Sequence, residues 1–348
     1  MKRDFKQVYY VTVFLLFAVI IGIVLINNEN FVGDALRGPL AKPTKTLPGV
    51  ISANIPAPVP CPAGSIEITQ RDVNRALQNT NNHGYMITQP GDYCLTETIR
   101  VDGSRLNIQS RGGLRVITVN SPRVTLNMNG NGIINVHGSK ALSGSYGYGF
   151  DGVNFWNPGS TRTEDVAIRN GLVQGFDNGV SFASTGGFEG VTVEEVTFAS
   201  NYNSLFIHEA EKVVVKNNRV IEANNGISVA GRRIGDSADV LIENNWLRGV
   251  RSKGISIYRV SGAAVKNNII DKLPSQQNPD RAIQAVDTID IIIDNNRFNN
   301  HQVGINAYFY TGGSYSGNTF CNVNNPVEVL PPAVLNDLGG NNFNAQNC

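Results

Sequence analysis

Four residues of this chain are of types that could catalyse a reaction on an acidic sugar: His208, Tyr258, Arg259 and Tyr308. The histidine and the tyrosines can accept or donate a proton, and the arginine can neutralise an anion. An arginine paired with the carboxylate of a uronic acid would acidify the neighbouring carbon-bound proton. A histidine or a tyrosine would take that proton, and a second such residue would donate one. Elimination would make the reaction that of a lyase, whereas reprotonation from the opposite face would make it that of an epimerase.

Only an internal repeat brings these residues together. A strand signal with period two recurs along the chain, and its outward positions are Ser181, Phe206, Ser228, Ser256, Gln284 and Asn306. Two residues beyond the last five lie His208, Ala230, Tyr258, Val286 and Tyr308, followed by Glu209, Gly231, Arg259, Asp287 and Phe309. If the repeats stack in register, the four candidate catalytic residues form one wall of a groove.

The longest repeats carry insertions at residues 231–236 and 273–281. Insertions into a solenoid gather on one face, which is often the binding face. We therefore expect the substrate-binding residues to be Arg232, Arg233, Arg281 and Asp287. The charged ones among them also fit a simpler interpretation as solvated surface charges.

The repeat itself predicts the fold class. A motif of apolar residues followed by a polar, Asn-rich pair recurs with spacings of 22, 27, 23, 28 and 22 residues, at Val193, Val215, Ile242, Val265, Ile293 and Tyr315. Periods of about 20 to 30 residues without helical periodicity indicate an all-β solenoid, in which stacked parallel strands bury continuous apolar columns. The Asn pairs are typical of tight turns whose side chains bond along the axis.

The first coil of such a solenoid needs a cap, because it would otherwise expose an apolar column and unpaired strand edges. Thr69-Gln70-Arg71-Asp72 resembles a capping box. Val73, Ala76 and Leu77 follow it with the spacing of one helix face. The sequence therefore predicts a short amphipathic cap helix at the N-terminal end.

From about residue 63 to 348 the chain resembles the right-handed parallel β-helix repeat proteins of the pectate-lyase-like superfamily. The resemblance rests on the coiled repeats, the cap helix, Pro90-Gly91-Asp92-Tyr93 and the segment Val124-Thr125-Leu126-Asn127-Met128-Asn129-Gly130. It implies a right-handed parallel β-helix and, where such proteins are active, an extended and often acidic polysaccharide along one face. It is specific for fold rather than for function, since catalytic and non-catalytic members share it.

The motifs that mark particular activities in that superfamily are mostly missing. The strings Asn-Thr-Asp, Asp-Asp and Gly-His-Gly of polygalacturonase-like members do not occur, which disfavours glycosidase chemistry. Tyr148-Gly149-Phe150-Asp151 resembles part of an alginate epimerase signature, but Gly152-Val153 replace its Pro-His, and we interpret the segment as a glycine-rich loop. The side chains at the outward strand positions, Ser181 to Asn306, cannot by themselves coordinate calcium, so no metal and no cofactor are expected.

The N-terminal part predicts a membrane anchor. Lys2, Arg3 and Lys6 form a cytoplasmic head, residues 1–7, before an uncharged run at 8–26 that is long enough to span a bilayer. Residues 27–60 carry six prolines and read as a stalk, so the β-helix domain at 61–348 is expected outside the cytoplasm, in the periplasm or at the cell surface. A cleaved signal peptide is the alternative.

Cysteine placement agrees with an exported domain. Cys61 and Cys94 lie early and Cys321 and Cys348 lie late, without zinc-site spacing, so two local disulfides are expected. A formal net charge of +1 speaks against a nucleic-acid partner. The expected partners are thus a polysaccharide, which the arginines favour as acidic, and membrane lipid through residues 8–26. Whether the chain is an enzyme stays open, because glycan binding without chemistry and a structural or assembly role at the cell surface fit the same residues.

Overall fold

The computed structural model describes residues 59–79, 83–103, 113–139, 149–159, 161–273, 280–343 and 345. The predicted head, membrane span and most of the stalk lie outside these residues, as do part of the second insertion and Cys348. Within the described ranges, no helix is long and apolar enough to cross a membrane.

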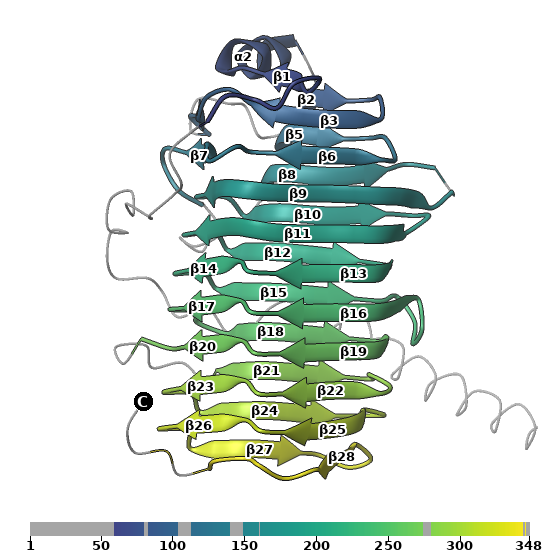
Figure 1. The fold of residues 1–348 in the computed structure, drawn as a ribbon, viewed down its shortest axis with the longest axis vertical. Coiled ribbons are helices and arrows are strands. Elements are labelled where there is room, and N and C mark those ends of the chain that lie inside the picture. The colour runs from purple at the N-terminus through teal and green to yellow at the C-terminus, as the bar shows by residue number, and fades with distance from the viewer. Residues whose placement is uncertain are drawn as a thin grey trace, which may run out of the picture. The chain divides into compact units, whose positions relative to one another are not determined.

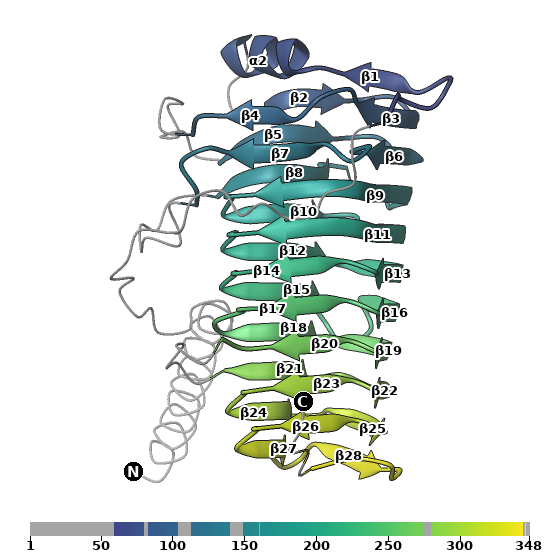
Figure 2. The same ribbon diagram turned by 60° about the vertical axis from the view of Figure 1, so that its left-hand side comes forward.

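The described strands wind into a stack of coils that forms a right-handed parallel β-solenoid, which confirms the expected all-β fold (Figure 1). Each central coil contributes one strand to a ten-stranded sheet, here called sheet B. It contributes two further strands, here called its first and second legs, to an eighteen-stranded sheet, here called sheet A. Figure 2 shows second legs of sheet A, such as β17, β20 and β23, stacked one above another. All pairings between these strands are parallel, as stacking of successive coils requires.

The strands of sheet B are β2 (His83–Ile87), β5 (Leu114–Val119), β8 (Phe150–Asn157), β10 (Asn178–Ser184), β12 (Asn203–His208), β15 (Asn225–Ala230), β18 (Lys253–Tyr258), β21 (Arg281–Val286), β24 (Val303–Tyr308) and β27 (Asn325–Val329). The N-terminal strands of sheet A are β1 (Ile66–Ile68), β3 (Gly91–Leu95), β4 (Ile99–Val101), β6 (Val124–Asn127), β7 (Gly132–Asn135), β9 (Thr163–Gln174) and β11 (Phe188–Ala199).

In the later coils of sheet A the first legs are β13 (Ala210–Lys216), β16 (Ser237–Glu243), β19 (Val260–Lys266), β22 (Ile291–Asp294), β25 (Gly312–Ser316) and β28 (Val334–Asp337). The second legs are β14 (Arg219–Ile221), β17 (Trp246–Arg248), β20 (Ile269–Asp271), β23 (Arg297–Asn299) and β26 (Thr319–Cys321).

The core follows the register that the repeat predicts. The six residues taken as equivalent pair in order from Val193 to Tyr315. Val215, Ile242 and Val265 are fully buried within this column. Because each coil is too thin to bury its own apolar face, these columns are what hold neighbouring coils together.

The second residue of each Asn pair forms a buried ladder along the axis. Asn245 is representative: its Nδ2 donates to Asn268 Oδ1 at 2.9 Å and to the Val215 carbonyl at 2.9 Å. Its own Oδ1 accepts from the backbone N–H of Asn218 at 3.0 Å. The first residue of the pair adopts a left-handed backbone, with φ of 55° at Asn244. Both results confirm the turn-ladder interpretation.

The predicted amphipathic helix is α2, Gln70–Asn79. The capping box is present, since the backbone N–H of Asp72 donates to Thr69 Oγ1 at 3.2 Å and that of Thr69 donates to Asp72 Oδ2 at 3.1 Å. Val73 is fully buried. Figure 1 shows α2 at the N-terminal end of the stack.

The disulfide between Cys61 and Cys94 is present, with a Cα–Cα distance of 5.9 Å. It joins the segment before β1 to strand β3. Cys321 is also disulfide-bonded. Its expected partner Cys348 lies outside the described residues, so that pairing stays a prediction.

Candidate functional site

The outer face of sheet B carries the row on which the functional prediction depends. The register pairs His208 with Ala230, Ala230 with Tyr258, Tyr258 with Val286 and Val286 with Tyr308. These five residues end their strands, and we call them the aromatic row. The structure therefore brings His208, Tyr258 and Tyr308 onto one face, in the order that the sequence predicts.

The aromatic row is an extended line rather than a compact cluster. Neighbouring parallel strands lie about 4.8 Å apart, so His208 and Tyr258 are separated by roughly 10 Å and His208 and Tyr308 by roughly 19 Å. The small side chain of Ala230 stands between His208 and Tyr258, and buried Val286 stands between the two tyrosines. The spacing of roughly 10 Å between His208 and Tyr258 is too long for direct contact between them, but it leaves room for one sugar ring.

Arg259 lies beside the row and is held by three interactions. Its guanidinium lies 4.6 Å from the ring centroid of Tyr258, and its Nη1 donates to the carbonyl of Arg232 at 2.7 Å. Its Nε is 3.6 Å from Asp287 Oδ2. Arg259 and Asp287 both follow the row in left-handed turns, with φ of 56° and 50°. Asp287 thus positions Arg259 and partly balances its charge.

The remaining predicted binding residues do not all reach this place. Arg232 does, because its Nε is 2.8 Å from Oε1 of Glu209, the residue that follows His208. Arg233 is exposed in the same insertion. Arg281, in contrast, begins β21 and pairs with Lys253, at the opposite end of the strands from the aromatic row. The direction of the strand explains the separation, since Arg281 lies two residues before Ile283 whereas Val286 of the row lies three residues after it.

Burial sets the protonation states along the row. It lowers the pKa of His208, so the imidazole is neutral at neutral pH. It raises the pKa of Tyr258 and of Tyr308, so both phenols stay protonated. The row therefore offers one group that can accept a proton and two that can donate one.

A second polar cluster, which sequence reasoning missed, lies on sheet B around Asp151 of β8. Asn178 Nδ2 donates to Asp151 Oδ1 at 2.7 Å, and Ser181 Oγ donates to Asp151 Oδ2 at 3.1 Å. Burial raises the pKa of the Asp151 carboxyl to about 6. Phe150 and Asp151 are strand residues, so the interpretation of this segment as a glycine-rich loop is wrong for them.

The basic residue Arg115 is the neighbour of Asp151 on the preceding coil, and Arg115 in turn lies near an aromatic ring. Arg115 pairs with Asp151 in register, and the Arg115 guanidinium lies 5.5 Å from the ring centroid of Trp156. Among the described residues, Arg115 Nε, Thr118 Oγ1 and Asn154 Oδ1 are buried and have no hydrogen-bond partner. The only sequence signal was the string Tyr-Gly-Phe-Asp, of which Tyr148 lies outside the described residues.

A family model described as a right-handed β-helix region matches residues 123–298 and residues 178–348. Together the two matches cover more than half of the chain. This chain belongs to the right-handed β-helix family. No curated protein sequence matches it.

Solved structures with a similar fold are glucanases of low identity. The catalytic unit of the thermostable GH87 α-1,3-glucanase from Streptomyces thermodiastaticus strain HF3-3 is 11% identical, with 82% of this chain and 70% of that chain covered and a TM-score of 0.35. A GH87 α-1,3-glucanase catalytic domain in complex with tetrasaccharides is 12% identical, with 83% and 71% covered and a TM-score of 0.30. A further one in complex with nigerose is 11% identical, with the same coverage and a TM-score of 0.29.

In this β-helix protein, the aromatic row presents one imidazole and two phenols, and the Arg259 guanidinium lies beside them. Aromatic faces and arginines bind sugar rings and carboxylates, respectively. Within the described ranges, no group of three or more His, Cys, Asp or Glu side chains is placed to hold a metal ion.

Proposed function

We propose that the aromatic row binds an extended acidic polysaccharide and acts on one uronate ring between His208 and Tyr258. The observation that carries this proposal is the register, which sets a proton acceptor and a proton donor on either side of small Ala230. A ring seated over Ala230 would have His208 on one face and Tyr258 on the other. Longer stretches of the same polymer would extend along the stack toward Tyr308.

The arginines would supply the electrostatic part of the reaction. Arg259 lies against Tyr258, and Arg232 adjoins it through its carbonyl. Either guanidinium would pair with the uronate carboxylate and stabilise the negative charge that develops when the adjacent proton leaves. Of the two, Arg232 is the more available, because its side chain is 62% exposed whereas that of Arg259 is 30% exposed.

Neutral His208 would remove the carbon-bound proton next to the carboxylate. In a lyase reaction, the electron pair of that bond forms a carbon–carbon double bond while the bond to the leaving sugar oxygen breaks, and Tyr258 protonates that oxygen. In an epimerase reaction, the carbanion instead takes the proton of Tyr258 on its opposite face. In both cases the proton held by His208 returns to the tyrosinate through water, which restores the starting state.

A non-catalytic glycan-binding role is the second candidate, and the anchoring of Arg259 favours it. The Arg259 guanidinium already contacts Asp287 and the Arg232 carbonyl, so it has fewer N–H groups left to stabilise a developing negative charge. In that role the histidine and the two tyrosines would serve as stacking platforms, and the polymer would leave unchanged. A purely structural or assembly role would require neither binding nor chemistry.

A proton NMR time course in deuterated water separates these roles. The full-length chain would be incubated with polygalacturonate and with polymannuronate, alongside His208→Gln, Tyr258→Phe and the control Ile292→Ala, an exposed residue of sheet A. New signals of unsaturated sugar identify a lyase, and deuterium uptake with altered anomeric signals identifies an epimerase. Either activity should disappear in His208→Gln and persist in the control. A silent spectrum with saturable binding supports the binding role, and absence of both refutes the proposal.

The organisation around the domain also remains a proposal. Residues 8–26 would anchor the chain, residues 27–60 would hold the β-helix away from the membrane, and α2 would cap the first coil. The Cys61–Cys94 disulfide supports a location outside the cytoplasm, because disulfides persist in oxidising compartments. Protease treatment of intact cells or spheroplasts should digest the β-helix domain from outside, and protection of that domain would contradict this topology.

A further inference from the structure

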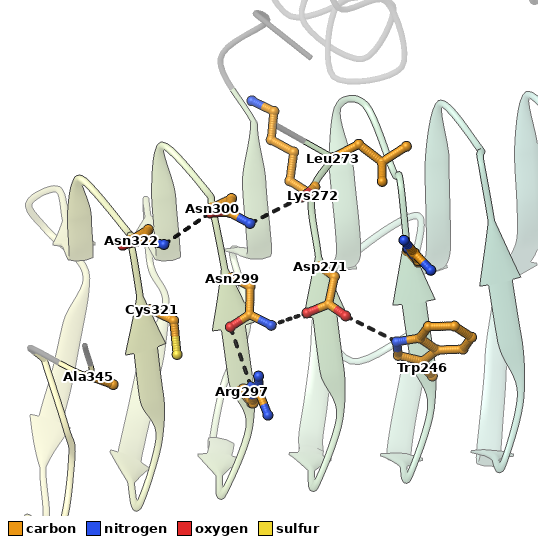
Figure 3. Close-up of a pocket in the computed structure, with 11 residues that line it drawn as sticks. Trp246, Asp271, Lys272, Leu273, Arg297, Asn299, Asn300, Cys321, Asn322 and Ala345 are labelled. Atoms are coloured by element: carbon orange, nitrogen blue, oxygen red, sulfur yellow. Dashed lines mark hydrogen bonds between the residues drawn. The ribbon is translucent and has the colours of Figure 1, made fainter. Parts of the chain in front are cut away.

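The second legs of sheet A carry a pocket that none of the predicted catalytic or substrate-binding residues lines. Its volume is about 390 Å³, and it lies on strands β17, β20, β23 and β26 (Figure 3). The side chains that matter for its chemistry are Trp246, Arg248, Asp271, Arg297 and Asn299. These strands belong to sheet A, so the pocket is separate from the aromatic row of sheet B.

A chain of hydrogen bonds fixes the orientation of the tryptophan. Trp246 Nε1 donates to Asp271 Oδ2 at 3.1 Å, and Asn299 Nδ2 donates to the other oxygen of the same carboxylate. Figure 3 shows these bonds running from Trp246 through Asp271 to Asn299. Arg219, on the preceding coil, lies 4.7 Å from the centroid of the Trp246 ring. The indole is therefore held in place before any ligand binds, which lowers the entropic cost of binding.

The charges around the pocket leave a positive excess. Two arginines, Arg248 and Arg297, line the pocket against the single carboxylate of Asp271. Lys272 Nζ is 3.0 Å from Asp280 Oδ1, so that pair adds no net charge. Arg248 is exposed on the same strand as Trp246, and within the described part of the chain no ion pair involves it. Residues two apart on a strand project from the same face, so Arg248 and Trp246 can address one ligand.

We infer that this pocket binds an acidic sugar unit, with its ring against Trp246 and its carboxylate on the Arg248 guanidinium. Aromatic rings bind the apolar face of a sugar, and a guanidinium forms charge-assisted hydrogen bonds with a carboxylate. Asn300 and Asn322 also line the pocket. Asn322 Nδ2 donates to Asn300 Oδ1 at 3.2 Å, which leaves Asn322 Oδ1 to accept from a sugar hydroxyl. None of its residues belongs to the aromatic row, so this inference can be tested independently of the function proposed above.

Tryptophan emission can report on this pocket alone, because the chain has only two tryptophans. In full-length Trp156→Phe, Trp246 is the sole tryptophan. Its emission, excited at a wavelength that tyrosine does not absorb, would be followed during titration with trigalacturonate, neutral cellotriose and adenosine monophosphate. We expect a saturable change of emission with trigalacturonate only. Arg248→Gln in this background should weaken the apparent affinity roughly tenfold, the loss expected from one charge-assisted hydrogen bond.

Two matched variants complete the test. Arg71→Gln removes another exposed arginine, from helix α2, and should leave the titration unchanged. Tyr258→Ala disables the aromatic row and should leave it unchanged as well, which separates failure of this inference from failure of the proposed function. If Trp156→Phe does not fold, the difference in emission between wild type and Trp246→Phe gives the same readout. No saturable change, an equal response to cellotriose, a response to the nucleotide alone, or an unaltered response in Arg248→Gln would each overturn the inference.

Discussion

Asp151 offers a prediction whose magnitude can be worked from the structure. Burial raises the pKa of its carboxyl from the ordinary 3.8 to about 6, although Asn178 and Ser181 donate hydrogen bonds to it. The folded protein therefore favours the protonated acid. Stability from this group is complete below pH 3.8 and is lost as the pH rises through about 6. At 1.36 kcal/mol for each pKa unit, ionisation of Asp151 costs about 3 kcal/mol at neutral pH.

The replacement Asp151→Asn keeps the shape and removes the charge. Its carbonyl can accept from Asn178, and its amide can donate to Ser181, so the hydrogen bonds have replacements. Relative to wild type, the variant should gain about 3 kcal/mol in the free energy of unfolding between pH 4 and pH 8.

Urea denaturation of both proteins across that pH range measures this difference. Asp290→Asn provides the control, since Asp290 is exposed and should show no such gain. A difference between wild type and Asp151→Asn that stays constant from pH 4 to pH 8 would refute the reasoning, because it would mean that Asp151 titrates alike in the folded and unfolded states.

Three further predictions concern the buried Asn ladder, the Cys61–Cys94 disulfide and the aromatic row. Asn245→Ala should destabilise the protein by about 2 to 4 kcal/mol in urea denaturation, because the buried Asn218 N–H and the Val215 carbonyl on the preceding coil lose this partner, whereas exposed Asn244→Gly should be nearly neutral; equal effects would contradict the ladder. Replacing Cys61 and Cys94 by serine should lower the free energy of unfolding by roughly 3 to 4 kcal/mol, the loop-entropy value for a separation of 33 residues; an unchanged melting temperature would argue against a stabilising role of this disulfide. If His208 acts as the base, its lowered pKa keeps it active on the acid side of neutrality, so the acid limb of the pH–rate profile should lie below pH 6.5, and a limb above that value would exclude it.

The sequence predicts the stack well because one residue type repeats at one structural position. Each Asn pair marks the same turn, so aligning the pairs also aligns the strands before and after them. That is why the aromatic row emerges in the predicted order, although its members are separated by many residues in the sequence.

The parts that escaped prediction depend on contacts between coils rather than on the repeat. Asp151 is unusual only because it is buried beside Asn178 and Ser181 of the next coil, and its own segment reads as a glycine-rich stretch. Trp246 occupies a variable position of a second leg, where its contact with Asp271 arises from stacking of β17 on β20.

The most direct test of the account is how affinity depends on the length of the ligand. The row extends about 19 Å from His208 to Tyr308, the length of several sugar units in an extended chain. Calorimetric titration of full-length Arg248→Gln, which disables the separate pocket, with oligogalacturonates of increasing length should show affinity rising until the oligomer spans the row and then remaining constant. In Tyr308→Ala the plateau should come with a shorter oligomer. An affinity that does not depend on length, or a plateau that Tyr308→Ala leaves unchanged, would contradict binding along the outer face of sheet B.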